Sequence, residues 1–495
     1  MSTNNNINPF ENYSGSMNLS RPGYLLLLFG FLSVIGLLVV KLGIIGIILV
    51  FALLFGSVFL YYLFCYPIIG FYTAIALNFM LLGIGRYIKG LPLGFGIDGI
   101  LVLTYIALFM NKFKKKIDWT PAKKDITFLC IIWFAYSLFE IINPEARSIQ
   151  AWISGRGIAF YPLLFVPLTL MFIDSSKKLQ MFFYIWGIFS LLGTLKGIMQ
   201  MTMGVDFAEQ EWLNEGSYKT HILFGKLRVF SFYSDAGQFG ANQGYTGVVF
   251  LIYAMSQSKI LSKLFFIFVG LLGIYGMVIS GTRGALAVPI VGFMTYFILS
   301  KNVKVIITGV AFLAIVFIFF KYTTIAQGNA QVRRMRTAFD PNDASLQVRL
   351  DNQKILKNYL SSRPFGGGIG HGGTKAQKYL PNAFLSNVAT DSWYVLIWVE
   401  EGIVGLLLHL GILFYVMIKA SLIVMFKIKD PVLKYKMSAL IAGMAGIMVA
   451  SYGNAVLGQM PTALLIYATM AIILNTDVFE KENEQSANLL NHSKH

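Results

Sequence analysis

Long apolar stretches separated by short polar breaks run from Tyr24 nearly to the C-terminus of the chain. A helix needs about 20 apolar residues to cross the hydrocarbon core of a bilayer, and most of these stretches approach that length. They lack the regular alternation of apolar and polar residues that the strands of a membrane β-barrel show. The pattern therefore predicts an all-α protein, built as a polytopic bundle of transmembrane helices.

We place fourteen candidate spans along the chain. They lie at about 24–40, 42–60, 67–85, 92–110, 126–143, 157–173, 181–203, 238–255, 264–281, 284–300, 305–320, 393–418, 438–456 and 462–475. The break at Lys41 is a single residue and the region 42–85 can be divided differently, so totals of twelve or thirteen spans stay open. The charges of the loops favour an even number.

The composition agrees with a membrane protein, since 56% of the residues are hydrophobic and only 13% are charged, with a mean hydropathy of +0.66. A water-soluble domain of this composition would leave too much apolar surface in water. The net charge of +17 raises the question of nucleic-acid binding. Much of that charge lies in lysine-rich loops and tails that membrane topology explains, so we expect no nucleic acid.

Two lysine-rich loops indicate the orientation of the bundle in the membrane. They are NKFKKKIDWTPAKKD (111–125) and KASLIVMFKIKDPVLKYK (419–436). Short lysine-rich loops usually stay in the cytoplasm, and both fall on the same side of the predicted bundle. Both termini then also lie in the cytoplasm, and the polar segment 2–20 lacks the order of a cleavable signal peptide. Cys65 and Cys130 lie in or beside spans, with no spacing typical of a disulfide or a zinc site.

Two segments on the predicted outer face, 204–237 and 321–392, are too long to be simple connections. In the longer one, SLQVRLDNQKILKNYL (345–360) has leucines at near-helical spacing and predicts an amphipathic helix. The following RPFGGGIGHGG (363–373) combines proline with a glycine cluster, which lets the backbone turn sharply and approach a ligand closely.

Arginine is distributed differently from lysine. Of the eleven arginines, only Arg21 falls on the predicted cytoplasmic side. The planar fork of arginine holds phosphate and carboxylate groups with paired hydrogen bonds, so the outer face is a candidate site for an anionic ligand. For Arg86 and Arg363 we expect only contact with lipid phosphates or helix ends. Arg228 and Arg283 stand at the ends of predicted spans and should point into the mouth of the bundle.

Several short motifs follow one another between about 220 and 420. RVFSFYSDAGQFGANQG precedes one span, SGTRGA forms the next outer turn, and LQVRLDNQKIL and RPFGGGIGHGG lie in the long loop. Asp391 and Ser392 are then followed after nine residues by Gly402, and after two more by Gly405. In this order the motifs resemble the bacterial O-antigen ligase and O-antigen or exopolysaccharide polymerase superfamily. The spacing matches the ligase motif, but aspartate replaces its initial histidine.

The resemblance implies transfer of a glycan from undecaprenyl pyrophosphate on the outer side of the cytoplasmic membrane, by an enzyme similar to the lipid-dependent multispan glycosyltransferases. The acceptor is either another lipid-linked glycan or the lipid A core. Membrane lipids surround the enzyme, and a chain-length regulator and a flippase are the protein partners that such a system suggests. The resemblance implies neither a nucleotide sugar nor a metal or other cofactor.

With this resemblance, the expected organisation has five regions. They are a cytoplasmic polar N-terminus (1–23), N-terminal transmembrane helices (24–203), a ligase- or polymerase-like region (204–420) that includes the extracytoplasmic loop 321–392, C-terminal transmembrane helices (421–475) and a cytoplasmic tail (476–495).

The resemblance also assigns roles to individual residues. Arg228, Arg283 and Arg349 are expected to bind the pyrophosphate as negative charge develops on it. Asp391, at the position of the ligase histidine, is expected to take the proton of the acceptor hydroxyl. An aspartate before an apolar helix is also a common N-cap, and this alternative stays open. His371 is the second catalytic candidate, although a solvent-exposed loop residue is the simpler interpretation.

Supporting roles are expected for three residues after Asp391. Glu400 matches an acidic residue of the family and should form an ion pair in the bundle. Gly402 and Gly405 are expected to allow close helix packing.

Aspartate in place of histidine favours a polymerase of O-antigen or exopolysaccharide repeat units, with an O-antigen ligase as the alternative. A transporter or flippase for lipid-linked oligosaccharides is the alternative from another class. Transporters tend to have inverted repeats and broken helices that meet at the midplane. We see no repeat in the sequence, and the large outer loop fits an enzyme of the membrane surface better.

Overall fold

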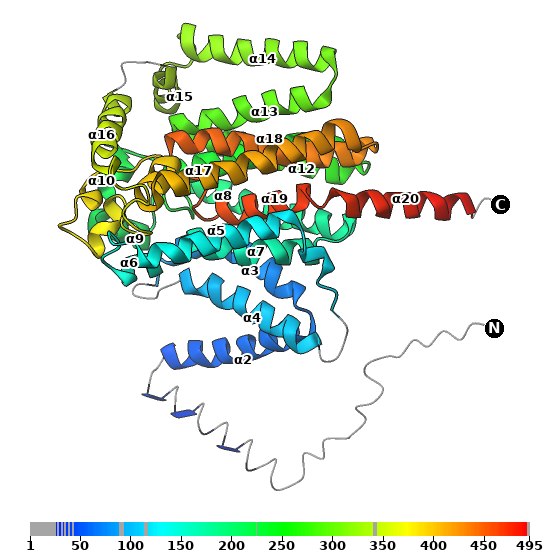
Figure 1. Ribbon diagram of the computed structural model, residues 1–495, viewed down its shortest axis with the longest axis horizontal. Helices are drawn as coiled ribbons and strands as arrows, with labels where there is room; N and C mark the ends of the chain where they lie inside the picture. The colour runs from blue at the N-terminus through cyan, green and yellow to red at the C-terminus, as the bar shows by residue number, and fades with distance from the viewer. Residues whose placement is uncertain are drawn as a thin grey trace. The chain divides into compact units, whose positions relative to one another are not determined.

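The structure, a computed structural model, describes residues 44–88, 94–112, 117–223, 225–339 and 344–492, with isolated positions between 26 and 41. The long helices are α2 (Ile44–Cys65), α3 (Ile68–Ile84), α4 (Gly94–Lys112), α5 (Asp125–Phe139), α7 (Gly157–Phe172), α8 (Ser176–Thr202), α11 (Ala236–Tyr253), α12 (Ile260–Ile279), α13 (Ala287–Ser300), α14 (Val303–Tyr322), α16 (Ala344–Leu360), α17 (Trp393–Leu422), α18 (Pro431–Gly453), α19 (Thr462–Ile473) and α20 (Thr476–His492) (Figure 1). The short α-helices are α6 (Ile149–Gly155), α9 (Phe207–Trp212), α10 (Tyr218–His221) and α15 (Ala330–Arg336).

Shorter elements complete the described fold. The 3-10 turns are η1 (Thr120–Ala122), η2 (Glu140–Ile142), η4 (Ala254–Ser256), η5 (Arg283–Leu286), η6 (Thr337–Phe339), η7 (Thr374–Lys378) and η8 (Leu385–Asn387). Two π-helical turns are η3 (Leu213–Ser217) and η9 (Ile423–Lys427). Strands β1 (Ile222–Leu223) and β2 (Lys226–Leu227) pair antiparallel, with Ile222 opposite Leu227. The chain divides into the units Met1–Pro67, which contains α2, and Ile68–His495, which contains all the other elements.

Nine described helices are long and apolar enough to cross a membrane, and a tenth span results if the bent pair of α19 and α20 is counted as one. The prediction of an all-α polytopic membrane protein is therefore confirmed. Helix α2, with 22 residues, lies in a further expected span. Helices α3, α11 and α19 occupy others, but α3 and α19 are too short and α11 is too polar to qualify singly. The first expected span, 24–40, lies largely outside the described residues.

The polar helix α11 lies at the centre of the bundle and is buried along nearly its whole length. The side chain of Gln243 donates to the backbone of Ser190 on α8 at 3.1 Å, and that of Asn242 donates to Thr462 on α19 at 3.1 Å. Glycine allows α12 to approach, since a Cβ on Gly273 would lie 2.8 Å from the carbonyl oxygen of Gln243. Close backbone approach and hydrogen bonds between helices replace the hydrophobic effect where lipid is the solvent.

The helices of the second unit run between two different ends. One of them, which we call the lysine end, comprises residues 117–125, 174–178, 419–430 and 474–483. Here Lys124 pairs with Asp477 at 2.6 Å, and Lys419 pairs with Asp125. These pairs confirm that the described parts of the two lysine-rich loops lie at the same end.

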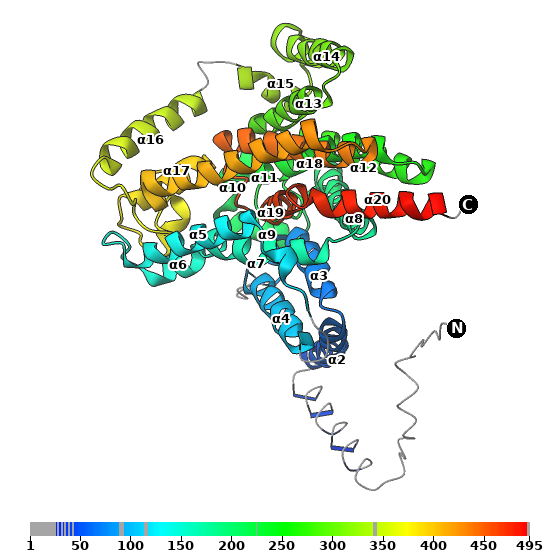
Figure 2. The same ribbon diagram turned by 45° about the vertical axis from the view of Figure 1, so that its right-hand side comes forward.

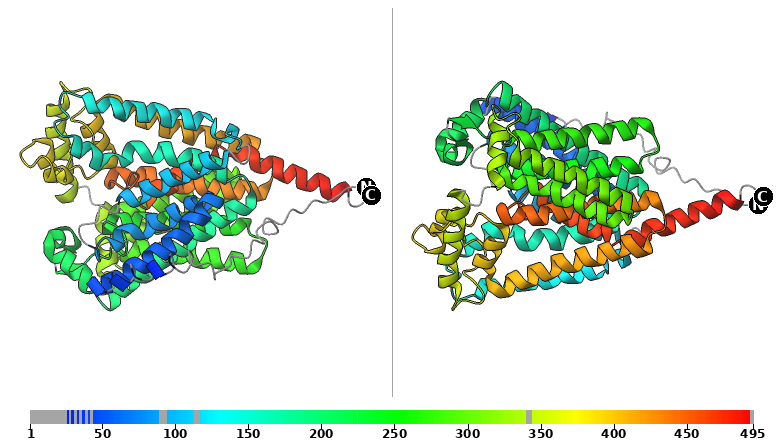
Figure 3. Two further views of the ribbon diagram at one scale, coloured as in Figure 1. Left: turned by 90° about the horizontal axis from the view of Figure 1, so that it is seen from below. Right: turned by 90° about the horizontal axis from the view of Figure 1, so that it is seen from above.

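The opposite end, which we call the loop end, comprises residues 140–156, 203–223, 225–235, 280–286, 323–339, 344–392 and 454–461. Figure 3 shows the segment from α16 to the start of α17 gathered there, away from the C-terminal α20. The Asn143 side chain, after α5, donates to the carbonyl of Phe365 at 3.0 Å. Both long segments that the sequence placed on the outer face meet at this end.

Helix α14 lies at the edge of the bundle beside α13 (Figures 1 and 2). Only 6% of the residues in its most apolar stretch are buried inside the protein. Lipid tails can cover such a surface, so α13 and α14 mark one apolar flank of the second unit.

Candidate functional site

A cavity of about 880 Å³ opens at the loop end, and we call it the arginine cavity. It is lined by Arg228, Arg283, Arg334, Arg349 and Asp391. These residues come from the segment after β2, from η5, from α15, from α16 and from the residue before Ser392 at the start of α17. The structure therefore brings together the three arginines and the aspartate that the sequence singled out.

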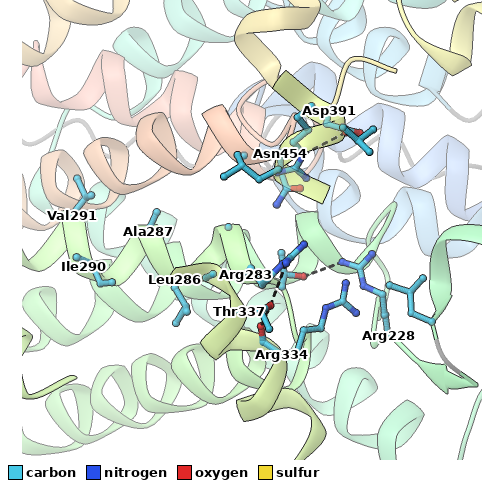
Figure 4. Close-up of a pocket in the computed structure, with 18 residues that line it drawn as sticks. Arg228, Arg283, Leu286, Ala287, Ile290, Val291, Arg334, Thr337, Asp391 and Asn454 are labelled. Atoms are coloured by element: carbon cyan, nitrogen blue, oxygen red, sulfur yellow. Dashed lines mark hydrogen bonds and ion pairs between the residues drawn. The ribbon is translucent and has the colours of Figure 1, made fainter. Parts of the chain in front are cut away.

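The same cavity has an apolar wall along α13. Leu286, Ala287, Ile290 and Val291 line it, and Figure 4 shows them running along one face of the helix away from the arginines. A positively charged head region thus joins a groove that leads along a membrane-spanning helix. This division of polarity suits a ligand with an anionic head and a long apolar tail.

Arg228 is positioned by the hairpin of β1 and β2. Its backbone N–H donates to the carbonyl of His221 at 2.8 Å, and its guanidinium donates to the carbonyl of Thr220 at 3.2 Å and to the hydroxyl of Thr282 at 3.4 Å. Its Nε is buried and has no hydrogen-bond partner among the described residues. Burial lowers the pKa of the guanidinium, and Asp235 partly opposes this shift. An anionic ligand would restore the solvation that Arg228 has lost.

Arg283 and Arg334 approach the cavity from the turn before α13 and from α15. Gly281 makes that turn possible, because its φ of +59° lies in the left-handed region that favours glycine. The Arg283 guanidinium donates to the hydroxyl of Thr337 at 3.2 Å, and this hydroxyl donates to the carbonyl of Arg334 at 2.8 Å. Thr337 thus couples the two segments that carry these arginines (Figure 4).

Arg86 is buried inside the protein, whereas we expected it to contact lipid phosphates or helix ends. Its side chain is 3% exposed, it donates to the carbonyls of Ser231 and Tyr233, and its guanidinium lies 4.5 Å from the centre of the Trp212 ring. The expectation of a lipid-facing Arg86 is wrong, because these bonds draw the guanidinium into the protein. Arg86 instead fixes the segment that leads from β2 to α11. Arg363 pairs with Glu145 at 3.0 Å.

Asp391 faces Arg349 of α16. The Arg349 Nε lies 3.4 Å from a carboxylate oxygen of Asp391, and the two side chains are 32% and 47% exposed. Helix α17 begins at Trp393 with Ser392 as its N-cap residue, and no side chain caps it. The capping alternative is therefore wrong for Asp391, because the helix starts one residue too late and the carboxylate turns toward α16.

Helix α17 is interrupted at Gly402, where φ is +67° and ψ is −171°. Residues 363–373, which follow α16 and which we call the glycine segment, lie in this break. The Gly367 N–H donates to Val399 O and the Gly368 N–H donates to Glu400 O, each at 2.8 Å. A Cβ on Gly402 would lie 2.0 Å from the carbonyl oxygen of Pro364. We expected Gly402 only to allow close helix packing. It also interrupts the backbone of α17, and the glycine segment packs into this interruption.

Gly405 does lie in a close contact, since a Cβ there would be 2.9 Å from the ring of Tyr136 on α5. The Tyr136 hydroxyl donates to the carbonyl of Glu401 at 2.6 Å, next to the break. Helix α5 therefore supports the interrupted part of α17, and the supporting role predicted for Gly405 stays a packing role.

His371 and Glu400 lie outside the arginine cavity. The expectation of an exposed His371 is wrong, because it is 4% exposed, its Nε2 accepts from the Ser148 N–H at 3.1 Å and its Nδ1 lies 3.0 Å from the carbonyl of Ile369. Burial lowers the pKa of this imidazole. Glu400 forms no ion pair in the described structure, because its Oε1 accepts from the Gly372 N–H at 3.3 Å and its Oε2 has no partner.

The described residues contain no group of three or more His, Cys, Asp or Glu that could hold a metal ion. The sequence analysis did not single out Arg334 as a site residue, although the three arginines of RRMR (333–336) indicate a cationic segment there. Periodicity alone does not tell which arginine of that run faces a cavity. The backbone break at Gly402 was also missed, since a single glycine does not interrupt the predicted span 393–418.

The fold and the site together define an all-α polytopic membrane protein with a cationic cavity at one end of its helices. Residues 246–410 match the model of a family described as O-antigen ligase. The match covers about a third of the chain and shows that this region is similar to the O-antigen ligase family. The matched region comprises the last part of α11, α12 to α16 and most of α17, and it includes Arg283, Arg334, Arg349 and Asp391. A comparison with curated proteins gives no match.

Proposed function

We propose that the protein is a polymerase that joins lipid-linked repeat units of an O-antigen or exopolysaccharide on the outer face of the cytoplasmic membrane. The observation that carries this proposal is the arginine cavity, in which four arginines adjoin an apolar wall. Undecaprenyl pyrophosphate has the same division into an anionic head and an apolar tail. Arginine forks suit the pyrophosphate, and the face of α13 offers apolar contact to the tail.

In the proposed reaction a hydroxyl of the acceptor attacks the anomeric carbon of the donor glycan. The new carbon–oxygen bond forms while the bond from that carbon to the pyrophosphate oxygen breaks, and the electron pair of the broken bond stays on the pyrophosphate. Arg228, Arg283 and Arg349, together with Arg334, stabilise the charge of this leaving group. The carboxylate of Asp391 takes the proton of the hydroxyl.

The pair of Arg349 and Asp391 fits this sequence of events. An ion pair at 3.4 Å between partly exposed side chains is weak and can exchange partners. A bound pyrophosphate competes with Asp391 for Arg349. Binding of the donor thereby releases the carboxylate to act as a base.

An O-antigen ligase is the second candidate, because the matched family is described by that name. The two enzymes share the donor, but a ligase transfers the glycan to the lipid A core. Asp391 in place of the ligase histidine favours the polymerase. The transporter alternative has less support, since the arginine cavity lies at one end of the helices and transporters bind near the midplane.

Deletion of the gene, followed by analysis of the surface glycans, tests the proposal. Loss of a polymerase leaves lipid A cores that carry a single repeat unit, whereas loss of a ligase leaves full-length polymer on the carrier lipid. Unchanged glycans would refute both functions. Complementation by Arg228→Ala or Asp391→Ala should fail, while Arg333→Ala should restore the glycans, since Arg333 is exposed and does not line the cavity.

A further inference from the structure

A second cavity of about 350 Å³ lies at the loop end and shares no lining residue with the arginine cavity. The two flank the start of α17, since Asp391 lines the first and Trp393 lines the second. The segment after α18 also lies between the two cavities, since Asn454 lines the arginine cavity and Gln459 lines the second cavity. From this arrangement we infer that the second cavity is a saccharide-binding site for the acceptor glycan.

The walls of the second cavity combine aromatic rings with planar polar groups. Tyr161, Tyr379 and Trp393 line it together with Arg156 and Glu400. A sugar ring has apolar C–H faces that pack on aromatic side chains, and its hydroxyls need donors and acceptors around the rim. A volume near 350 Å³ is at the small end of the range for ligand sites, about 300 to 1,000 Å³, and fits a terminal sugar.

Glu400 supplies the most specific sign of a ligand. The residue is 4% exposed, and its Oε2 is buried without a hydrogen-bond partner in the described structure. Glu400 is the one acidic residue among those that line the cavity, so its carboxyl is the acceptor that a sugar hydroxyl would meet there. The break at Gly402 and the bond from Gly372 hold the side chain in place.

Two other side chains are fixed in advance. The Trp393 indole donates to His409 at 3.0 Å, and its ring packs so tightly that a Cβ on Gly458 would lie 1.8 Å from it. Arg156 donates to Asp98 at 2.7 Å through Nε, and its guanidinium lies 3.8 Å from the centre of the Phe95 ring. Rigid groups of this kind lose little entropy when a ligand binds.

The chemistry of these walls favours a saccharide over other ligands. A phosphate would meet the carboxyl of Glu400, and a purely apolar ligand would offer no donor to that carboxyl. A polyhydroxylated ring offers such donors. Lys375 stands exposed beside the cavity and can reach further hydroxyls or an acidic sugar.

The position favours the acceptor over the donor. In displacement at an anomeric carbon, the attacking oxygen and the leaving oxygen lie on opposite faces of the sugar. If the arginine cavity holds the leaving pyrophosphate, the second substrate has to reach Asp391 from another side. The second cavity lies on that other side of the α17 start. This assignment to the acceptor rests on the proposed function.

Binding of a soluble saccharide tests the inference. The probe is the lipid-free repeat unit, released by mild acid from the lipid-linked glycan of the source organism and titrated by calorimetry into the full-length protein in nanodiscs. Glu400→Gln should weaken binding by about 10-fold or more, since it replaces one carboxyl oxygen by an amide nitrogen that cannot accept a hydrogen bond. Lys375→Ala should cause a smaller loss, because the lysine is exposed.

Lys378→Ala is the matched control, because Lys378 lies on the same turn η7, is exposed and does not line the cavity. Lys375→Ala cannot unfold a buried core, so it keeps the test valid if Glu400→Gln proves unstable. Equal binding by the wild type and both cavity variants, or no binding by the wild type, would overturn the saccharide site.

A transfer assay separates the acceptor from the donor. Glu400→Gln should raise KM for the acceptor and leave KM for the donor as it is, and the reverse result would overturn the acceptor assignment. If the wild-type protein transfers no glycan at all, the proposed function fails and the acceptor assignment fails with it. The saccharide site is then judged by the calorimetric comparison alone.

Discussion

Arg228 and Arg334 reach the same cavity from segments on either side of α11 to α14. Replacement of either by alanine should lower kcat/KM for glycan transfer by about 10²- to 10³-fold, the usual cost of removing one preorganised donor to a developing charge. Purified protein with a lipid-linked donor provides the measurement. Arg333→Ala is the control on the same helix as Arg334, because Arg333 is exposed and outside the cavity. Equal losses in the Arg333 and Arg334 variants would contradict the assignment.

Asp391 is expected to matter for chemistry and hardly for folding. Asp391→Asn should abolish transfer but leave the thermal midpoint nearly unchanged, because the carboxylate caps no helix and its pair with Arg349 is partly exposed. Asp351→Asn, which changes a 65% exposed carboxylate on α16, should keep full activity. An Asp391→Asn protein that transfers glycan at the wild-type rate would remove this residue from the mechanism.

His371 should make the glycine segment sensitive to acid. Burial, together with nearby Arg147, lowers the pKa of its imidazole below the ordinary 6.5, so the folded protein takes up this proton at a lower pH than the unfolded chain does. The stabilisation is therefore complete above pH 6.5 and is lost as the pH falls below it. Protonation also removes the acceptor for the Ser148 N–H.

Hydrogen exchange of residues 363–373 at about pH 7.5 and about pH 5.5 measures this effect, after correction for intrinsic exchange. Protection should fall at the lower pH in the wild type and stay constant in His371→Gln, which has no titrating ring. An equal fall in both proteins would assign the effect to another group.

At the residue scale, the sequence identified Asp391, Arg228, Arg283 and Arg349 because their motif spacing and their positions at span ends are local signals. It did not show that His371 is buried. That burial arises from contact between a glycine segment and the start of α6, and such contacts between distant segments leave no periodic trace in the chain.

The interruption of α17 is the main feature at the scale of elements. Gly402→Ala should destabilise the protein by about 2 kcal/mol or more, because alanine is strained at a φ of +67° and its Cβ would meet Pro364 O. The thermal midpoint in detergent is the measurement.

Gly411→Ala on the same helix is the control. A Cβ at Gly411 has no atom within 4 Å, so this change should be neutral or stabilising by up to about 1 kcal/mol. Similar midpoints for the two variants would argue against the break.

The sequence predicted one continuous span over 393–418, whereas the structure has a helix broken at Gly402. Hydropathy does not distinguish the two, because it averages over the whole span and stays high although Glu400 and Glu401 precede Gly402. The amphipathic helix predicted over 345–360 is confirmed as α16 (Ala344–Leu360).

At the scale of the whole molecule, we propose that the loop end lies outside the cytoplasm and the lysine end inside. In a protein with Cys65 and Cys130 replaced by serine, Lys378→Cys should react with an impermeant maleimide in intact spheroplasts. Lys178→Cys, in the first turn of α8 at the lysine end, should react only after permeabilisation. The opposite pattern would reverse the orientation.

Hydropathy and lysine placement were enough to predict the helical bundle and the common side of the two basic loops. They were not enough to predict the arginine cavity, whose wall joins α13, α15 and α16 with the segments before α11 and α17. Such a cavity depends on how segments pack at one end of the bundle, and a single sequence does not encode that packing in any local pattern.

The central claim is that the arginine cavity holds the pyrophosphate of a polyprenyl donor. The most direct measurement is the Kd of undecaprenyl pyrophosphate for the full-length protein in nanodiscs, compared among the wild type, Arg228→Ala, Arg334→Ala and Arg333→Ala. The account predicts Kd values about 10- to 100-fold higher for the first two variants and a wild-type value for Arg333→Ala. The same Kd in all four proteins would contradict it.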